Sequence, residues 1–300
     1  MVFVALFVTV DRIISYGINK LYRKTDNYPI EYQNAFNKIL YNIDEDVVII
    51  GESRSTHSYI PQLIKDSLGL SCINAGKDGT DFLVQNFCIN RMLDRYQPKV
   101  IIWELTPNAL TDIELEDELD RMNALQPFYH IPEAKQLINQ RSKYEKFKML
   151  SHLYRWNGKL LGIIKILIGN KQDNGTNGYM PLDESRHPTK LIDIKYDNTI
   201  VDSRVEAMRA TLQRVNRCGV LLVVVSSPVY YRSNMRYTKQ FAVFHEALKE
   251  EHTCWLDYSE DQYFIERDDL FYDIDHLNNN GAIKYMQVFI PQLKQMLIHE

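Results

Sequence analysis

The stretch VVIIGESRSTHSYIPQ, Val47 to Gln62, decides the fold class of this 300-residue chain. Four apolar residues run into Gly51, Glu52 and Ser53, and a polar segment with a helical pattern follows. This change of pattern predicts a buried strand, a tight turn and then a helix. Two interpretations of Ser53 remain open. It caps the helix, or it belongs to a site at the carboxyl end of a parallel strand, where open α/β sheets bind ligands.

Further apolar runs indicate more strands, and helical patterns lie between most of them. The five predicted strands lie at 46–53, 70–76, 99–105, 219–228 and 253–259. Continuous apolar strands that alternate with helices are typical of a parallel sheet covered on both faces. We therefore expect a flavodoxin-like three-layer α/β/α fold with strand order 2-1-3-4-5. The first helix is predicted over 56–69, with Gly69 as its C-terminal cap.

The alternation of strands and helices breaks once, between Thr111 and about Val201. Helical patterns and a long polar loop replace the strands there. We expect a helical insertion over about 111–200 within a single domain that covers 25–300. Because the insertion follows strand three on the ligand-binding side of the sheet, we favour a cap over the site. The alternative is a helical subdomain packed elsewhere.

Composition and charge exclude some classes of function. The formal net charge is -4 and there is no sustained basic run, so nucleic acid is not an expected partner. The four cysteines form no CxxC pair, which argues against a thiolate zinc site. Free cysteine behaves as a small apolar residue, so we expect buried free thiols. The sequence does not predict an oligomeric state.

The first 24 residues form a separate apolar segment. MVFVALFVTV is about half the roughly 20 residues that a membrane helix needs, and it lacks the basic leader of a signal peptide. Lys20, Arg23 and Lys24 follow it like the exit from a membrane interface. Two interpretations remain: a membrane anchor completed by residues upstream, or an apolar helix packed on the domain.

Polar residues follow several predicted strands and match the parts of a serine acyl-transfer site in order. Ser53 would be the nucleophile, His276 its general base and Asp273 the group that orients the imidazole. The backbone N–H groups of Ser53 and Gly79, with the side-chain amide of Asn108, would bind the oxyanion. Each segment also has a structural explanation, as a turn or a helix cap.

These segments resemble the sequence blocks of the SGNH/GDSL hydrolases. The first block appears as GES with Ser53, the second as NAGKDG with Gly79, the third as ELTPNA with Asn108 and the last as DIDH with His276. The resemblance covers roughly 47–108 and 219 to the end, and leaves out the 111–200 insertion. It implies a serine esterase or acyltransferase that forms an acyl-enzyme on ester substrates, commonly acetylated carbohydrate, without a metal or organic cofactor.

The chain departs from the family pattern at three positions. Glu52 stands where the family has Asp, Pro107 replaces the Gly of the third block, and Ala109 replaces its Asp. Because Pro107 and Ala109 flank Asn108, they bear on where the Asn108 amide points.

Three further residues are candidates for substrate contact. His57 follows Ser53 by four residues, on the same face of a helix, where it would line the pocket or compete as a base. Arg54 and Arg186 would contact an anionic substrate.

The resemblance therefore predicts an SGNH-type hydrolase or acyltransferase for O-acyl esters, with O-acetyl groups on carbohydrate as the favoured substrate. A membrane-proximal start and a helical insertion look like the branch that handles cell-surface polysaccharide, with the catalytic domain facing the periplasm or exterior; a cytoplasmic location is the alternative. One rival is a non-catalytic carbohydrate-binding or assembly protein with the same fold. Another is a metal-dependent hydrolase that uses His57, Asp273, Asp275 and His276.

Overall fold

The protein is described from a computed structural model, which covers residues 2–28, 30, 34–111, 121–169, 176–185 and 187–299. The chain forms two compact units. Unit 1 combines Met1–Ile43 with Ile113–Asp173, and unit 2 combines Asp44–Asp112 with Asn174–Glu300. Arg186, one of the predicted substrate contacts, lies outside the described residues.

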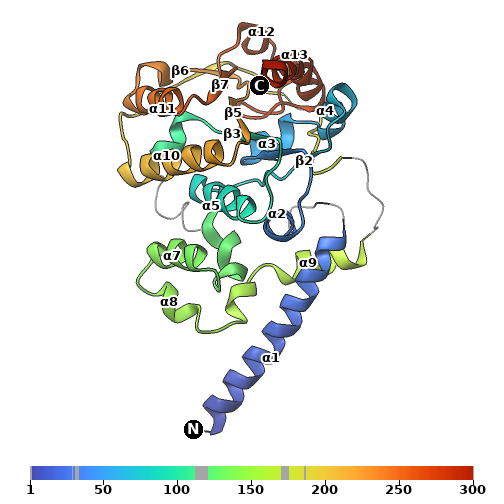
Figure 1. Cartoon of the computed structure of the whole chain (residues 1–300), viewed down its shortest axis with the longest axis vertical. Coiled ribbons are helices and arrows are strands. Elements are labelled where there is room, and N and C mark those ends of the chain that lie inside the picture. The colour runs from blue at the N-terminus through green and yellow to red at the C-terminus, as the bar shows by residue number, and fades with distance from the viewer. Residues whose placement is uncertain are drawn as a thin grey trace. The chain divides into compact units, whose positions relative to one another are not determined.

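Unit 2 is built on a parallel sheet of five strands in the order β2-β1-β3-β5-β7 (Figure 1). Every neighbouring pair is parallel, with Val47 opposite both Cys72 and Val100. The predicted three-layer fold and strand order are confirmed. Two further strands among the described residues lie in a separate sheet and do not change this order. The five strands are β1 Val47–Ile50, β2 Cys72–Asn74, β3 Val100–Glu104, β5 Leu221–Ser226 and β7 Cys254–Asp257.

Helices cover both faces of this sheet because almost every residue of its inner strands is buried. On one face, alternate strand residues such as Ile49 and Ile102 pack in one apolar cluster with Ile64 and Phe289. On the other face, Trp103 stacks on Phe82 of α5. The helices of unit 2 are α3 Ser53–Ser58, α4 Pro61–Leu68, α5 Phe82–Leu93, α10 Asp202–Arg217, α11 Lys239–Glu250, α12 Gln262–Ile265 and α13 Asn279–His299, with short 3-10 turns at Pro107–Leu110 (η2), Met235–Tyr237 (η5) and Asp268–Leu270 (η6).

The helix predicted over 56–69 is two helices. α3 ends at Ser58, the backbone of Ile60 is extended, and α4 starts at Pro61. The break follows from Pro61, because a proline ring clashes with an α conformation of the preceding residue. The predicted cap is confirmed: Gly69 ends α4 with a left-handed φ of 69°.

A second, two-stranded sheet was not predicted from the sequence. β4 (Ile192–Ile194) pairs in parallel with β6 (Tyr231–Ser233). β4 lies in the expected insertion and is mostly exposed, so it lacks the continuous apolar pattern that identified the other strands.

Unit 1 is helical in its described residues and begins with α1 (Val2–Lys24). α1 and the turn after it, Val2–Asn27, are long and apolar enough to cross a membrane. Only 17% of the 18-residue apolar stretch within them is buried. Tyr22 packs edge-on against Trp156 and near Phe128. The other elements are η1 Thr25–Asn27, α2 Ala35–Tyr41, η3 Met122–Phe128, α7 Pro132–Arg141, α8 Glu145–Lys148, η4 Tyr154–Trp156 and α9 Leu160–Ile168. The insertion's role as a cap stays a prediction.

The four cysteines are free thiols. Cys72 and Cys88 are buried as expected, whereas Cys218 and Cys254 are only partly buried. Burial raises the pKa of the Cys254 thiol, which keeps it in its neutral form.

Candidate active site

Ser53, His276 and Asp273 meet at the carboxyl edge of the sheet in unit 2. His276 Nε2 lies 2.7 Å from Ser53 Oγ, and His276 Nδ1 lies 2.9 Å and 3.0 Å from the two carboxylate oxygens of Asp273. A carboxylate can only accept hydrogen bonds, so Nδ1 carries the proton and Nε2 accepts from the Ser53 hydroxyl. The predicted contacts Ser53–His276 and His276–Asp273 are confirmed.

Ser53 stands at the first turn of α3 because β1 ends in a tight approach to β3. A Cβ atom at Gly51 would lie 2.7 Å from Glu104 Cβ and 2.8 Å from Ser55 Cβ, so only glycine fits there. Glu52 is extended and serves as the N-cap residue of α3. The strand therefore delivers Ser53 directly to the start of a helix, where backbone N–H groups lack partners within the helix.

Asp273 and His276 are held by a compact turn between Phe271 and Leu277, which form an isolated bridge. Asp273 Oδ1 accepts the backbone N–H groups of Asp275 and His276, each at 2.9 Å. Burial opposes ionisation of Asp273, but its hydrogen bonds from His276 and from the Asp275 backbone outweigh it and lower the Asp273 pKa. Asp273 is thus an ionised acceptor that orients the imidazole before any substrate binds.

The two other predicted oxyanion donors follow β2 and β3, the two strands that flank β1. Gly79, in the loop after β2, has a φ of 63°, a left-handed conformation that glycine adopts without strain. Asn108 lies in η2, after β3, and is exposed. The Thr111 hydroxyl lies 2.8 Å from the Asn108 backbone carbonyl oxygen and 3.1 Å from Asn108 Oδ1. Because a hydroxyl has one hydrogen, the shorter contact to the carbonyl holds it, and Thr111 alone does not fix the plane of the Asn108 amide.

Asn74 has a structural role that the sequence did not predict. Its buried Nδ2 donates to the carbonyl oxygens of Ser55 at 2.7 Å and Tyr59 at 3.0 Å. Its Oδ1 accepts the backbone N–H of Gly76 at 3.1 Å. Asn74 therefore ties the end of β2 to α3 and so helps to hold the helix that carries Ser53.

His57 forms a second histidine–aspartate pair beside the first. Its ring packs edge-on against His276, with the ring centroids 5.6 Å apart. His57 Nδ1 lies 2.6 Å from the Met180 carbonyl oxygen, and Nε2 lies 3.4 Å from a carboxylate oxygen of Asp78. Both neighbours only accept hydrogen bonds, so this geometry suits an imidazolium with a proton on each nitrogen.

The electrostatics of His57 agree with its geometry. Burial alone would lower the His57 pKa, but Asp78 and the Met180 carbonyl raise it above the ordinary value. In turn, His57 lowers the pKa of Asp78 against the effect of burial. Because both ring nitrogens are engaged, His57 does not have a free lone pair with which to compete for the Ser53 proton.

Arg54 is nearly buried beneath the site. Its guanidinium lies 2.9 Å from Glu104, the last residue of β3. Glu104 also accepts the hydroxyls of Tyr59 and Ser227. Burial would lower the Arg54 pKa, but Glu104 and other negative groups raise it. The expected contact of Arg54 with an anionic substrate stays a prediction, since this pairing gives Arg54 a role in holding α3 to β3.

Asp78, Glu104 and the Met180 carbonyl were not identified from the sequence. Asp78 lies within the NAGKDG segment and Glu104 lies near the end of a predicted strand, so their positions already indicated that they lie close to the site. Their partners His57 and Arg54 are distant in sequence, and the pairing emerges only from the fold. Met180 belongs to the long polar loop, which a strand or helix pattern does not place.

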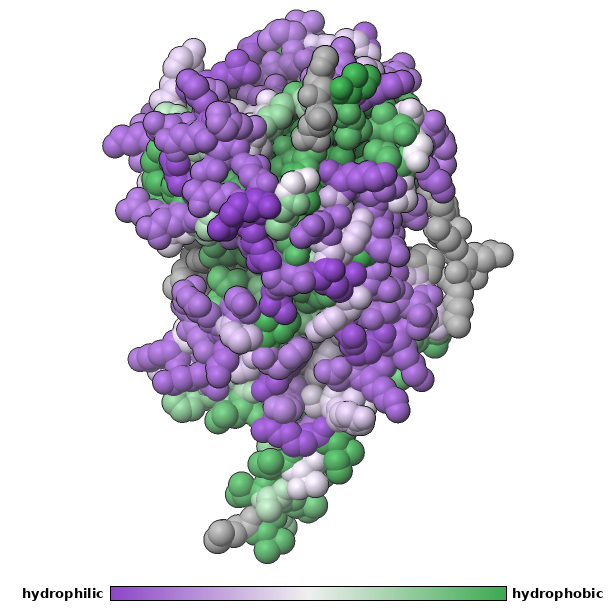
Figure 2. Space-filling model, in the orientation of Figure 1, coloured by the Kyte–Doolittle hydropathy of each residue, from purple (hydrophilic) through white to green (hydrophobic). Residues whose placement is uncertain are grey.

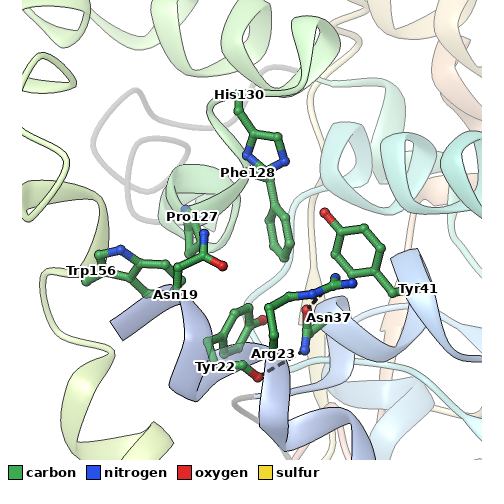
Figure 3. A pocket seen from close by; sticks show the side chains of 9 residues that line it. All are labelled: Asn19, Tyr22, Arg23, Asn37, Tyr41, Pro127, Phe128, His130 and Trp156. Carbon is green, nitrogen blue, oxygen red and sulfur yellow. Dashed lines mark hydrogen bonds between the residues drawn. The ribbon is translucent and has the colours of Figure 1, made fainter. Parts of the chain in front are cut away.

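A cavity of about 200 Å³ lies in unit 1 (Figure 3). The Arg23 guanidinium lies over the Tyr41 ring, 3.5 Å from its centroid, and reaches Asn37 Oδ1 at 3.5 Å. Aromatic rings and polar groups share the lining, and no member of the triad belongs to it. The lining residues are Asn19, Tyr22, Arg23, Asn37, Tyr41, Pro127, Phe128, His130 and Trp156.

Within the described residues, no group of three or more His, Cys, Asp or Glu side chains is arranged to hold a metal ion. The chain was also compared with known proteins. No model of a protein family matches it, and no curated protein is significantly similar to it. The residues and their geometry therefore carry the functional interpretation.

Proposed function

We propose that unit 2 is a serine esterase or acyltransferase that acts on O-acyl esters, with carbohydrate O-acetyl groups as the favoured substrate class. The observation that carries this proposal is the Ser53–His276–Asp273 chain of hydrogen bonds, at 2.7 Å and 2.9 Å. Such a chain is the geometric signature of an activated serine nucleophile.

In the first half-reaction, Ser53 Oγ attacks the ester carbonyl carbon while His276 Nε2 takes the hydroxyl proton. The carbonyl oxygen becomes an oxyanion. When the tetrahedral intermediate collapses, the bond to the alcohol oxygen breaks and His276 returns the proton to the departing alkoxide. The products are the free alcohol and an acyl group on Ser53.

In the second half-reaction, an acceptor hydroxyl attacks the acyl-enzyme. His276 takes the acceptor's proton, and the collapse of the second intermediate returns that proton to Ser53. Water as acceptor gives a carboxylic acid, and a sugar hydroxyl gives a new ester. The same residues serve both outcomes, so the acceptor alone separates an esterase from an acyltransferase.

The oxyanion is assigned to the backbone N–H groups of Ser53 and Gly79 and to Asn108 Nδ2. The position of Ser53 at the start of α3 supports the first donor, and the exposed position of Asn108 in η2, just after β3, supports the third. The cation proposed at His57 would add positive potential on the same side. Preorganised donors of this kind usually supply the largest single part of transition-state stabilisation.

The resemblance of four ordered sequence blocks to SGNH/GDSL hydrolases supports the same reaction class. The apolar α1 supports a membrane-associated enzyme of the cell envelope, with unit 2 facing the periplasm or exterior. Under this proposal the partner is a carbohydrate or small-molecule ester.

The decisive experiment is intact-mass measurement after exposure to a phosphonofluoridate. The wild-type protein should gain the mass of one phosphonyl group, because Ser53 Oγ displaces fluoride. Ser53→Ala should gain none, and Ser67→Ala, an exposed serine of α4, should react like wild type. An unmodified wild-type protein would favour the non-catalytic binding protein. A hydrolytic activity that a chelator abolishes would favour the metal-dependent rival.

A further inference from the structure

The first observation concerns Asp11, an acidic residue in the middle of the apolar α1. Asp11 is nearly buried. Its carboxylate accepts the Ser151 hydroxyl at 2.5 Å and the backbone N–H groups of His152 at 2.8 Å and Leu153 at 3.0 Å. Three donors thus compensate the charge that would make Asp11 costly within hydrocarbon.

The next residues of α1 bind the same segment. Arg12 donates to the Leu150 carbonyl oxygen at 3.1 Å, and the Ser15 hydroxyl accepts the Trp156 indole N–H at 3.1 Å. The segment 150–156 is therefore fixed to α1 at the turn where the uninterrupted apolar run ends.

Before that turn, α1 is apolar and exposed. Val2, Phe3 and Phe7 are 80%, 87% and 70% exposed. Figure 2 shows this projecting part of the helix as mostly hydrophobic surface. From Val2 to Val10 the helix rises about 14 Å at 1.5 Å per residue. This is about half of the roughly 30 Å hydrocarbon core of a bilayer.

The segment 143–150, with sequence KYEKFKML, leads into the residues that Asp11 and Arg12 bind, and it exposes further apolar side chains. Its exposed apolar side chains are Tyr144, Phe147 and Leu150, which we call the apolar foot; they are 57%, 61% and 66% exposed. Leu150 is the residue whose carbonyl binds Arg12. The foot is thus attached to α1 next to the end of its apolar half.

Three exposed lysines lie among the residues of the apolar foot: Lys143, Lys146 and Lys148. Lys148 forms an ion pair with the buried Glu145, with Nζ 2.8 Å from the carboxylate, so Lys143 and Lys146 are the cations assigned to the lipid. The Lys143 and Lys146 ammonium groups lie 5.0 Å and 5.2 Å from the rings of Tyr144 and Phe147. Aromatic and aliphatic side chains mixed with lysine are typical of segments that lie in a membrane interface. Lysines at that position attract anionic lipid head groups.

We propose that unit 1 binds a bilayer at two places: Val2–Val10 enters the hydrocarbon, and the apolar foot lies in the interface of an anionic lipid surface. The bonds from Asp11 and Arg12 to residues 150–153 hold the foot next to the end of the apolar half of α1. A lipid surface is the occupant because the foot is attached to an exposed apolar helix and carries cations between its apolar side chains. This inference concerns unit 1 alone and does not depend on the proposed acyl transfer.

The test places a tryptophan in the foot of the full chain and measures its quenching by brominated lipids. Phe147→Trp and Leu150→Trp are compared with Tyr237→Trp, a control at an 89% exposed aromatic position in unit 2. Of the three native tryptophans, Trp103 and Trp156 are buried and Trp255 is partly buried, and the wild-type signal is subtracted to remove their contribution. In vesicles with anionic lipid, we expect the added fluorescence at 147 and 150 to fall at least twofold and that at 237 to stay unchanged. Equal quenching at all three positions would overturn the proposal, as would an unquenched foot, which would indicate a protein partner there.

A second arm tests the lysines. Lys143 and Lys146 are changed together to Gln, and the control changes Lys239 and Lys249, exposed in unit 2, in the same way. Lys148 is kept because it pairs with the buried Glu145. The ratio of partition coefficients between anionic and zwitterionic vesicles should fall at least tenfold for the foot variant, because two cations beside the anionic head groups are lost. An equal fall in the control would show that only net charge matters and would contradict the assigned surface.

Discussion

Two histidine–aspartate pairs meet at the carboxyl edge of the sheet, and they differ in what the second nitrogen of each histidine contacts. His276 has Asp273 on Nδ1 and the Ser53 hydroxyl on Nε2. His57 has Asp78 on Nε2 and the Met180 carbonyl on Nδ1. A hydroxyl can give up a proton and a carbonyl cannot. Under the proposed function, the His276 pair would move a proton and the His57 pair would hold a positive charge.

The largest expected effect comes from the nucleophile and its base. Ser53→Ala or His276→Ala should lower kcat by about 10⁴- to 10⁶-fold, because each removes the proton-transfer step of the triad. Steady-state hydrolysis of an acetyl ester measures this, with Ser67→Ala as control. If Ser53→Ala retained most of the activity, the hydrogen-bonded Ser53 and His276 would not carry the reaction.

The two aspartates allow a matched test of the comparison. Asp273→Asn should lower kcat by about 10⁴-fold, because the amide permits the wrong imidazole tautomer. Asp78→Asn should cost far less, since His57 does not take the serine proton. The ratio of the two kcat values is the measurement. Equal losses would mean that both pairs take part in proton transfer.

Asn108→Ala tests the oxyanion site that both histidines would flank. We expect kcat to fall by about 10²- to 10³-fold with little change in KM, which is the usual effect of losing one oxyanion donor. An unchanged kcat in Asn108→Ala would show that Pro107 turns this amide away from the reacting carbonyl.

His57→Gln should have the smallest catalytic effect. Glutamine retains hydrogen bonding but removes the positive charge that would attract the oxyanion. Two opposite unit charges about 6 Å apart in a partly solvated site attract each other by roughly one to a few kcal/mol. We expect kcat/KM to fall on the order of tenfold. A loss as large as that of His276→Ala would contradict the assignment of His57 as a fixed cation.

The same pair predicts a modest pH dependence of stability. The His57 pKa is raised in the folded state, so its contribution is fully present below the ordinary value of about 6.5 and is lost as the pH rises through the raised value. The Asp78 pKa is lowered, so its contribution is lost only in acid. Between pH 6 and pH 9, the melting temperature of wild type should therefore fall by more than that of His57→Gln, as measured by calorimetry.

The sheet and the triad could be predicted because their signals are local. Each central strand is a continuous apolar run, and Ser53 and His276 follow the turn signals of their own segments. The second pair could not be predicted, because Asp78 and Met180 reach His57 only through the fold. β4 was not predicted, because an exposed three-residue strand has no continuous apolar pattern. The break between α3 and α4 was missed although Pro61 marks it, since the helical spacing on both sides hid it.

The bonds between Asp11 and residues 151–153 join segments about 140 positions apart. During synthesis from the amino terminus, α1 emerges long before the donors that compensate its carboxylate. All of unit 1 has been made by Asp173, whereas the sheet of unit 2 still lacks β5 and β7. The order of the chain thus lets the helical unit close on α1 first. By then β1, β2 and β3 have been synthesised, but β3 gains its second neighbour only after β5, Leu221–Ser226, has been synthesised.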